Sequence, residues 1–186
     1  MTTFQKIFYH ISRLLLGVVF LFSGFVKSVD PQGFAYKLQD YFTAFGLSSL
    51  HPIAYALAFF LVSLELYVGL LLLFSEWRKV AAVLVSAFML FFTPLTLYLA
   101  MANPVSDCGC FGDAVKLTNW ETFWKNVPLL LAALYFLRRV FRVKPEGRSI
   151  RCTGCRFVQQ GLFPIILGLL ALFPSFWATV SLPMID

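Results

Sequence analysis

The chain has 186 residues, of which 60% are hydrophobic and 13% charged, and its mean hydropathy is +0.81. A water-soluble domain of this length could not bury so much apolar surface in one core, so the composition excludes a soluble globular protein. The formal net charge is +6, but seven of the 15 Lys and Arg lie in one stretch, residues 138–156. This clustering favours a membrane-topology signal over nucleic-acid binding.

Hydrophobic residues recur in blocks of roughly 20 residues, the length that an α-helix needs to cross ~30 Å of hydrocarbon. We therefore expect an all-α, polytopic membrane helix bundle that forms a single domain over residues 1–186. The five predicted transmembrane helices are residues 7–29, 52–74, 80–102, 120–137 and 157–180. The first resembles an uncleaved signal anchor, because Lys6 and Arg13 precede its long apolar run and no small-residue cleavage site follows.

Between the first two spans, residues 33–46 predict an amphipathic helix. Its apolar side chains recur at helical spacing. They are Phe34, Leu38, Tyr41, Phe42 and Phe45. This pattern is typical of an anchor that lies along the outer membrane–water boundary, and a lid over an outward-facing site is the alternative. Before the fourth span, the sequence from Thr118 to Glu121 predicts a capping box.

The basic residues predict the orientation of the bundle. The link between the fourth and fifth spans holds the seven clustered Lys and Arg against a single acidic residue, Glu146, so the positive-inside rule places it in the cytoplasm. Alternation of the spans then puts the N-terminus inside, and the loops 30–51 and 103–119 and the C-terminus outside. The chain stops at Asp186 soon after the fifth span. We expect that the natural protein, or a partner, continues there into an external domain.

Two of the four cysteines, Cys108 and Cys110, are separated by one glycine on the predicted outer loop. A disulfide between them would close a small ring, for which Gly109 supplies backbone freedom. Departure from relaxed geometry makes a disulfide easier to reduce, and so small a loop gives little entropic stabilisation. These features favour redox exchange over a structural disulfide. Inert thiols, a disulfide to a partner and metal binding are the alternatives.

Asp107 and Asp113 flank this pair. Their negative charges would raise the pKa of the two thiols, which favours the disulfide as the resting state.

The other two cysteines, Cys152 and Cys155, lie in the predicted cytoplasmic link beside Arg151 and Arg156. Nearby guanidinium groups lower the pKa of a thiol, so this pair could receive electrons from a cytoplasmic thioredoxin-like donor. The alternatives are incidental reduced cysteines or an acylation site. Because a transmembrane helix separates the two cysteine pairs, we expect no metal site shared between them.

Three charged residues within the predicted spans need a reason, because charges are costly in hydrocarbon. Glu65 lies inside the second span and Arg13 inside the first, at depths that predict a structural Arg13–Glu65 ion pair. A proton relay, or a polar contact to a quinone head group, is the functional alternative. Lys27 lies near the outer end of the first span, where it could snorkel towards water or stabilise a thiolate at the outer site.

Two runs of sequence are similar to the first two helices of the DoxX-like membrane proteins. The first begins at Arg13-Leu14-Leu15-Leu16-Gly17 and continues with Phe20, Ser23-Gly24 and Lys27. The second is Glu65 followed by Gly69 and several leucines. The segment Asp107-Cys108-Gly109-Cys110-Phe111-Gly112-Asp113 closely resembles the Cys-Gly-Cys-Phe-Gly motif of the MauE branch.

The resemblance implies a four-helix core in the bacterial inner membrane, with a fifth helix added in this chain. The MauE branch is associated with disulfide formation in a secreted dehydrogenase subunit. The family is also distantly similar to vitamin-K-epoxide-reductase-type bundles, which pass electrons from thiols to quinone. The Cys152 and Cys155 pair is a departure from the family pattern.

These observations lead to two hypotheses of different kinds. In the first, the protein is a membrane thiol–disulfide oxidoreductase, and Cys108 and Cys110 exchange electrons with an extracytoplasmic thiol or disulfide protein. The other end of the route is quinone in the bundle or the Cys152 and Cys155 pair, and the direction of flow stays open. In the second, the protein is a non-enzymatic scaffold of a redox or maturation complex.

Overall fold

The computed structural model describes residues 3–74, 77–105, 109–110 and 117–142, together with residues 166, 168–169 and 171–172. The elements of this part of the chain are helices, as predicted. They are α1 (Thr3–Val29), α2 (Pro31–Ala44), the short 3₁₀ helix η1 (Ser48–Ile53), α3 (Ala54–Phe74), α4 (Arg78–Ala102) and α5 (Asn119–Arg142).

Three helical segments are long and apolar enough to cross a membrane, and they match the first three predicted spans. They are Thr3–Val29, Ser48–Phe74 and Arg78–Ala102. The predicted fourth span, 120–137, lies within α5, which is helical throughout but is not one of these three. The predicted fifth span, 157–180, lies outside the described residues except at positions 166, 168–169 and 171–172, which are helical.

Side chains define where the helices begin. Asp30 precedes α2 and accepts a hydrogen bond from the backbone N–H of Gly33 at 2.8 Å. Before α5, the backbone N–H of Thr118 donates to the Glu121 carboxylate at 2.9 Å, and the Glu121 N–H donates to the Thr118 hydroxyl at 3.3 Å. The predicted capping box is therefore confirmed.

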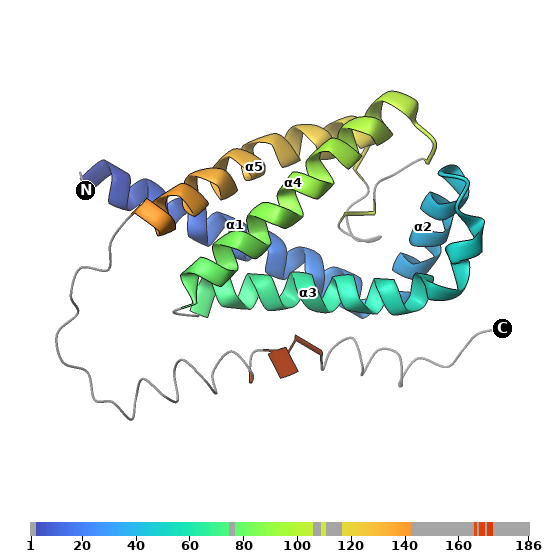
Figure 1. The fold of residues 1–186 in the computed structure, drawn as a ribbon, viewed down its shortest axis with the longest axis horizontal. Coiled ribbons are helices and arrows are strands. Elements are labelled where there is room, and N and C mark those ends of the chain that lie inside the picture. The colour runs from blue at the N-terminus through green and yellow to red at the C-terminus, as the bar shows by residue number, and fades with distance from the viewer. Residues whose placement is uncertain are drawn as a thin grey trace.

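The helices form two packed pairs, α1 with α3 and α4 with α5, and α1 also contacts α5 (Figure 1). The α3 and α4 helices meet at the end of the bundle where α1 begins. From there they diverge towards the opposite end, which we call the α2 end because α2 lies across it (Figure 1). The space between α3 and α4 is thus a wedge that widens towards α2.

Glycine allows the backbones of α1 and α3 to approach closely. A Cβ atom at Gly69 would lie 2.7 Å from the backbone nitrogen of Leu21, and one at Gly24 would lie 2.8 Å from that of Leu66. Contacts this short exclude any side chain at either glycine, so small residues set the distance between these two helices. They also fix the register in which α1 and α3 lie side by side.

The apolar face of α2 turns into the protein. Phe34, Ala35 and Leu38 are buried and belong to one hydrophobic cluster with Ala58 and Val62 of α3. The helix predicted over residues 33–46 is present, with bounds two residues earlier at each end. Its apolar face packs on α3.

Candidate functional site

The Cys-Gly-Cys loop is described at its second and third residues, and Cys108, Asp107 and Asp113 lie outside the described residues. Gly109 has φ of +62°, a left-handed conformation that favours glycine. It is buried, and a Cβ atom there would lie 3.5 Å from Cγ of Lys37 in α2. The backbone freedom predicted for this glycine is therefore used where the loop passes α2.

Ser23 of α1 holds the loop by its main chain. Its hydroxyl lies 2.7 Å from the carbonyl oxygen of Cys110 and 2.9 Å from Oε2 of Glu65 in α3. One hydroxyl hydrogen faces two acceptors, so the donated hydrogen bond is shared or alternates between them. The main chain of the Cys-Gly-Cys loop is thus connected directly to a carboxylate inside the bundle.

Glu65 forms an ion pair with Lys27, not with Arg13. The Lys27 ammonium lies 2.7 Å from Oε1 of Glu65, and both side chains are about 5% exposed (5% and 6%). The same ammonium lies 4.9 Å from the ring centroid of Phe34, within range of a cation–π interaction. The predicted Arg13–Glu65 pair is therefore wrong. Lys27 is buried in the protein, whereas one expectation was that it would snorkel towards water.

Arg13 instead binds the C-terminal end of α3. Its guanidinium donates hydrogen bonds to the backbone carbonyls of Leu72 and, at 3.1 Å, Leu73. The last carbonyls of a helix have no partner within the helix, and in a membrane such groups must be satisfied by the protein. Arg13 therefore has a structural role that is separate from the cysteine loop.

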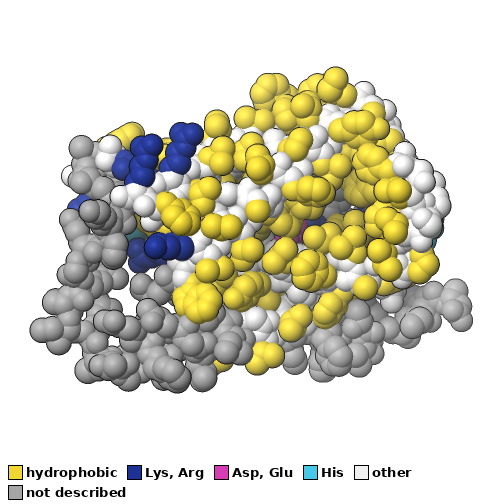
Figure 2. Space-filling view, viewed as in Figure 1, with side chains coloured by type: hydrophobic (Ala, Val, Ile, Leu, Met, Phe, Trp, Pro, Cys, Tyr) yellow, Lys and Arg dark blue, Asp and Glu magenta, His cyan; other side chains and the backbone are white. Residues whose placement is uncertain are grey.

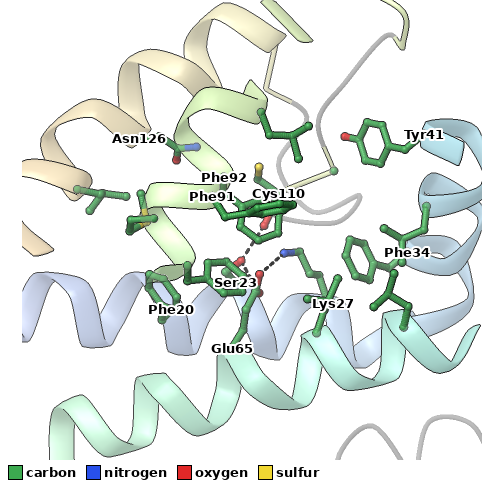
Figure 3. Close-up of a pocket in the computed structure, with 18 of the residues that line it drawn as sticks. Phe20, Ser23, Lys27, Phe34, Tyr41, Glu65, Phe91, Phe92, Cys110 and Asn126 are labelled. Carbon is green, nitrogen blue, oxygen red and sulfur yellow. Dashed lines mark hydrogen bonds and ion pairs between the residues drawn. The ribbon is translucent and has the colours of Figure 1, made fainter. Parts of the chain in front are cut away.

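Ser23, Lys27 and Glu65 line a cavity of about 290 Å³ at the α2 end, and Gly109 and Cys110 form part of its wall (Figure 3). The rest of the lining is dominated by apolar and aromatic side chains. They come from α1, α2 and the segment that follows it, α3, α4 and α5, and include Phe20, Phe34, Phe42, Phe88, Phe91 and Phe92. The site is therefore a largely apolar chamber with a polar cluster on α1 and α3, further polar side chains on α5, and a partly buried cysteine.

The cavity opens on the long side of the bundle. Figure 2 shows an apolar face that is hollowed near its middle, with an acidic side chain visible in the hollow. Glu65 is the acidic residue among those that line the cavity. The same view shows Lys and Arg side chains gathered at the end of the bundle opposite α2 (Figure 2).

A second hollow, of about 390 Å³, lies between α2 and the residues that follow α4, and we call it the polar groove. Its lining residues are Lys37, Asp40, Tyr41, Thr43, Ala44, Pro104 and Val105. Lys37 lies in this groove and also against Gly109, while Tyr41 lines both hollows. Lys37 and Tyr41 therefore connect the polar groove with the Cys-Gly-Cys loop and the apolar cavity.

Lys27 and Glu65 were predicted from the sequence as charged residues within the spans, but Ser23 was not predicted as their partner. A usable signal was present, because Ser23 and Lys27 are four residues apart and so lie on one face of α1. Asn126 of α5 was also missed; it lines the cavity and donates to the Thr96 hydroxyl at 3.2 Å. The second cysteine pair, Cys152 and Cys155, lies outside the described residues.

No curated protein and no solved structure matches this chain. A family model does match, over residues 5–139, which includes all five α-helices up to the last turn of α5 and the whole Cys-Gly-Cys segment. Its description is "Methylamine utilisation protein MauE". The match covers well over half of the chain and agrees with the motif resemblance noted in the sequence, and the chain is accordingly a member of the MauE family of membrane proteins.

Proposed function

We propose that this MauE-family membrane protein is a thiol–disulfide redox protein, in which Cys108 and Cys110 exchange electrons with a protein on the extracytoplasmic side. One observation carries the proposal. The main chain of Cys110 is held by Ser23 at the wall of a cavity, and the adjacent glycine lies against a polar groove. A cysteine in this position can face an external protein on one side and a ligand of the bundle on the other.

The exchange takes place in two steps. A partner with two thiols attacks the Cys108–Cys110 disulfide through a mixed disulfide. The partner's S–S bond forms, the Cys108–Cys110 bond breaks, and two electrons and two protons reach this pair. In the second step an oxidant restores the disulfide and takes up the same two electrons and two protons.

Electrons can flow in either of two directions. A lipid-soluble quinone would be reduced to quinol, in which case the protein oxidises its partners. In the reverse direction, Cys152 and Cys155, reduced by a cytoplasmic thioredoxin-like donor, would pass two electrons and two protons to the Cys108–Cys110 disulfide, and the resulting thiols would reduce a disulfide of the partner. The apolar cavity beside Cys110 supports the quinone route.

The orientation is proposed from the charge distribution. Arg138, Arg139 and Arg142 end α5 at the end of the bundle opposite the cysteine loop, and the basic link follows them in the sequence. Excess Lys and Arg mark cytoplasmic segments of membrane proteins. This supports a bacterial inner-membrane protein with five crossings, its N-terminus inside, and the Cys-Gly-Cys loop and C-terminus outside.

The test is an exchange assay with purified protein in lipid nanodiscs and a reduced dithiol peptide as the partner. With a water-soluble quinone analogue present, we expect the wild type to oxidise the peptide catalytically, and Cys108→Ser and Cys110→Ser to abolish turnover. A Cys152→Ser/Cys155→Ser variant should turn over normally if quinone is the oxidant. If the inner pair is the electron source instead, the wild type will not oxidise the peptide, and Cys152→Ser/Cys155→Ser will stall the reduction of a disulfide peptide by a thioredoxin-like donor.

The scaffold hypothesis predicts a different outcome. If the cysteines only tether a partner, the wild type will show no more peptide oxidation than the Cys110→Ser variant. Both cysteine variants would nevertheless lose the partner in a co-purification experiment. That combination of results would reject the redox proposal.

A further inference from the structure

We propose that the cavity beside Cys110 is a binding site for a neutral, lipid-soluble ring compound with hydrogen-bond acceptors on opposite edges, which enters sideways from the bilayer between α3 and α4. A 1,4-dicarbonyl ring with an apolar tail is the simplest such ligand. That this ligand is the oxidant of the cysteine pair rests on the proposed function, whereas the binding itself does not.

The position of the opening indicates access from lipid. The α3 and α4 helices diverge towards the α2 end, and the hollow lies on the apolar long face of the bundle (Figures 1 and 2). Leu57 and Leu61 of α3 line the cavity on one side, and Phe91 and Leu95 of α4 line it on the other. Phe91 is 65% exposed, so this rim is in contact with the surroundings of the helices. A molecule that reaches the cavity through hydrocarbon must be neutral, because charges are costly there.

The walls favour a flat ring. Phe20 of α1 and Phe88 and Phe92 of α4 line the cavity, and they form a chain of contacting rings. The ring centroids are 5.2 Å apart between Phe20 and Phe88, and 4.3 Å apart between Phe88 and Phe92. Aromatic rings stack or meet edge to face at such distances, and a bound ring can extend the same arrangement. The volume of about 290 Å³ is at the lower limit of small-molecule sites, so a tail would extend through the opening into lipid.

Hydrogen-bond donors lie on two opposite walls of the cavity. On α1, the Lys27 ammonium has three hydrogens and gives one to Glu65 at 2.7 Å. On α5, Asn126 lines the cavity, has two amide hydrogens and gives one to Thr96 at 3.2 Å. Remaining hydrogens on both walls can be donated to a ligand with an acceptor at each edge. Figure 3 shows Lys27 and Asn126 on different sides of the chamber, with Cys110 between them.

If the ligand is a quinone, the redox step balances. Two S–H bonds of Cys108 and Cys110 break and one S–S bond forms. The two electrons and two protons that are released convert the two ring carbonyls into hydroxyl groups. Donors at both carbonyls stabilise the negative charge that develops on these oxygens during reduction.

The experiment is photoaffinity labelling in nanodiscs of phosphatidylethanolamine and phosphatidylglycerol. The probe is a fully substituted benzoquinone with a ten-carbon tail and a ring azide. The protein carries Cys108→Ser and Cys110→Ser, so that labelling reports binding and not thiol chemistry. We expect cross-links in the cavity-lining parts of α1, α3 and α4, and competition by the same quinone without the azide but not by decanol.

Matched variants locate the site. Leu61→Trp and Leu95→Trp fill the opening from opposite walls, and each should lower labelling about tenfold. Leu90→Trp makes the same change on α4 at a residue that is 61% exposed and outside the cavity lining, and it should label as the parent does. The double variant Lys27→Met/Glu65→Met removes the polar cluster without leaving a lone charge, and it should also lose about tenfold.

Several outcomes would overturn the proposal. They are labelling that spreads evenly over the lipid-facing helices, equal competition by decanol, or equal labelling of the Leu61→Trp and Leu90→Trp variants. Specific labelling without any peptide oxidation by the wild type would retain the ligand site and reject the redox function. Peptide oxidation by the wild type without specific labelling would retain the redox function and reject the ligand site.

Discussion

The two ends of the helix bundle are built differently. Where α3 meets α4, the interior is filled by buried side chains, and Leu16, Leu71, Leu72, Ala81 and Phe136 are all no more than 1% exposed. At the α2 end, the interior holds an ion pair, a serine and a cavity walled by aromatic rings. We call the end where α3 meets α4 the closed end and the α2 end the open end. Packing at the closed end holds the helices together, so the open end can contain a cavity without loss of the fold.

The largest expected effect is at the open end. Lys27→Met leaves the Glu65 carboxylate buried without its cation, and it should lower the free energy of unfolding by about 3 kcal/mol or more. Lys27→Met/Glu65→Met should recover most of that loss, because no isolated charge remains. Thermal unfolding of the purified protein in one detergent measures both. Equal destabilisation by the single and double variants would show that the pair is not stabilised as the structure indicates.

At the closed end, Leu71→Ala removes a side chain that is 0% exposed and leaves a void. It should cost about 3 kcal/mol. Leu61→Ala, in the wall of the cavity, should cost about 1 kcal/mol, because part of its surroundings is already empty. Equal costs in the same unfolding assay would contradict the distinction between a filled and a hollow end.

The contact between α1 and α3 gives the next effect. Gly69→Ala places a methyl group 2.7 Å from the backbone nitrogen of Leu21, so the helices must separate at a cost of about 2 kcal/mol. Gly168→Ala is the control, because a Cβ atom there lies 3.8 Å from the nearest atom of Tyr67. A comparable fall in melting temperature for both variants would mean that helix separation is not the cause.

The smallest effect on stability, but the most specific one, is expected from Ser23→Ala. It removes a hydrogen bond to the Cys110 carbonyl and should cost about 1 kcal/mol. The matched variant is Ser86→Ala, which removes the hydrogen bond from the Ser86 hydroxyl to the Ala133 carbonyl, 3.2 Å long, nearer the closed end. After reduction, maleimide should modify Cys110 faster in the Ser23→Ala variant only. Unchanged alkylation would show that Ser23 does not position the loop.

Sequence patterns predicted the helices well, because their length and composition are local properties. The capping box at Thr118 and the helix α2 were predicted for the same reason. The partner of Glu65 was not, since it depends on how far α1 and α3 slide past each other. Counting helical rise from the membrane surface favoured Arg13, but the close approach at Gly24 and Gly69 sets the register that brings Lys27 to Glu65.

The cavity could not have been predicted from the sequence. Its lining comes from five helices, and each contributes residues that would be ordinary in any apolar span. Only the angle between α3 and α4 makes them face a common space, and that angle is a property of the assembled bundle. The same applies to α2, whose apolar face is equally suited to a lipid surface and to a protein cavity.

The ion pair at the open end has a consequence for how the protein is made. Glu65 follows Lys27 by 38 residues, so α1 emerges from the ribosome before the helix that carries its counter-charge. A lysine in a newly inserted helix is tolerated near a membrane surface and is costly deeper in the hydrocarbon. Final seating of α1 must therefore wait for α3, and the first two spans mature as a unit during biosynthesis and not one after the other.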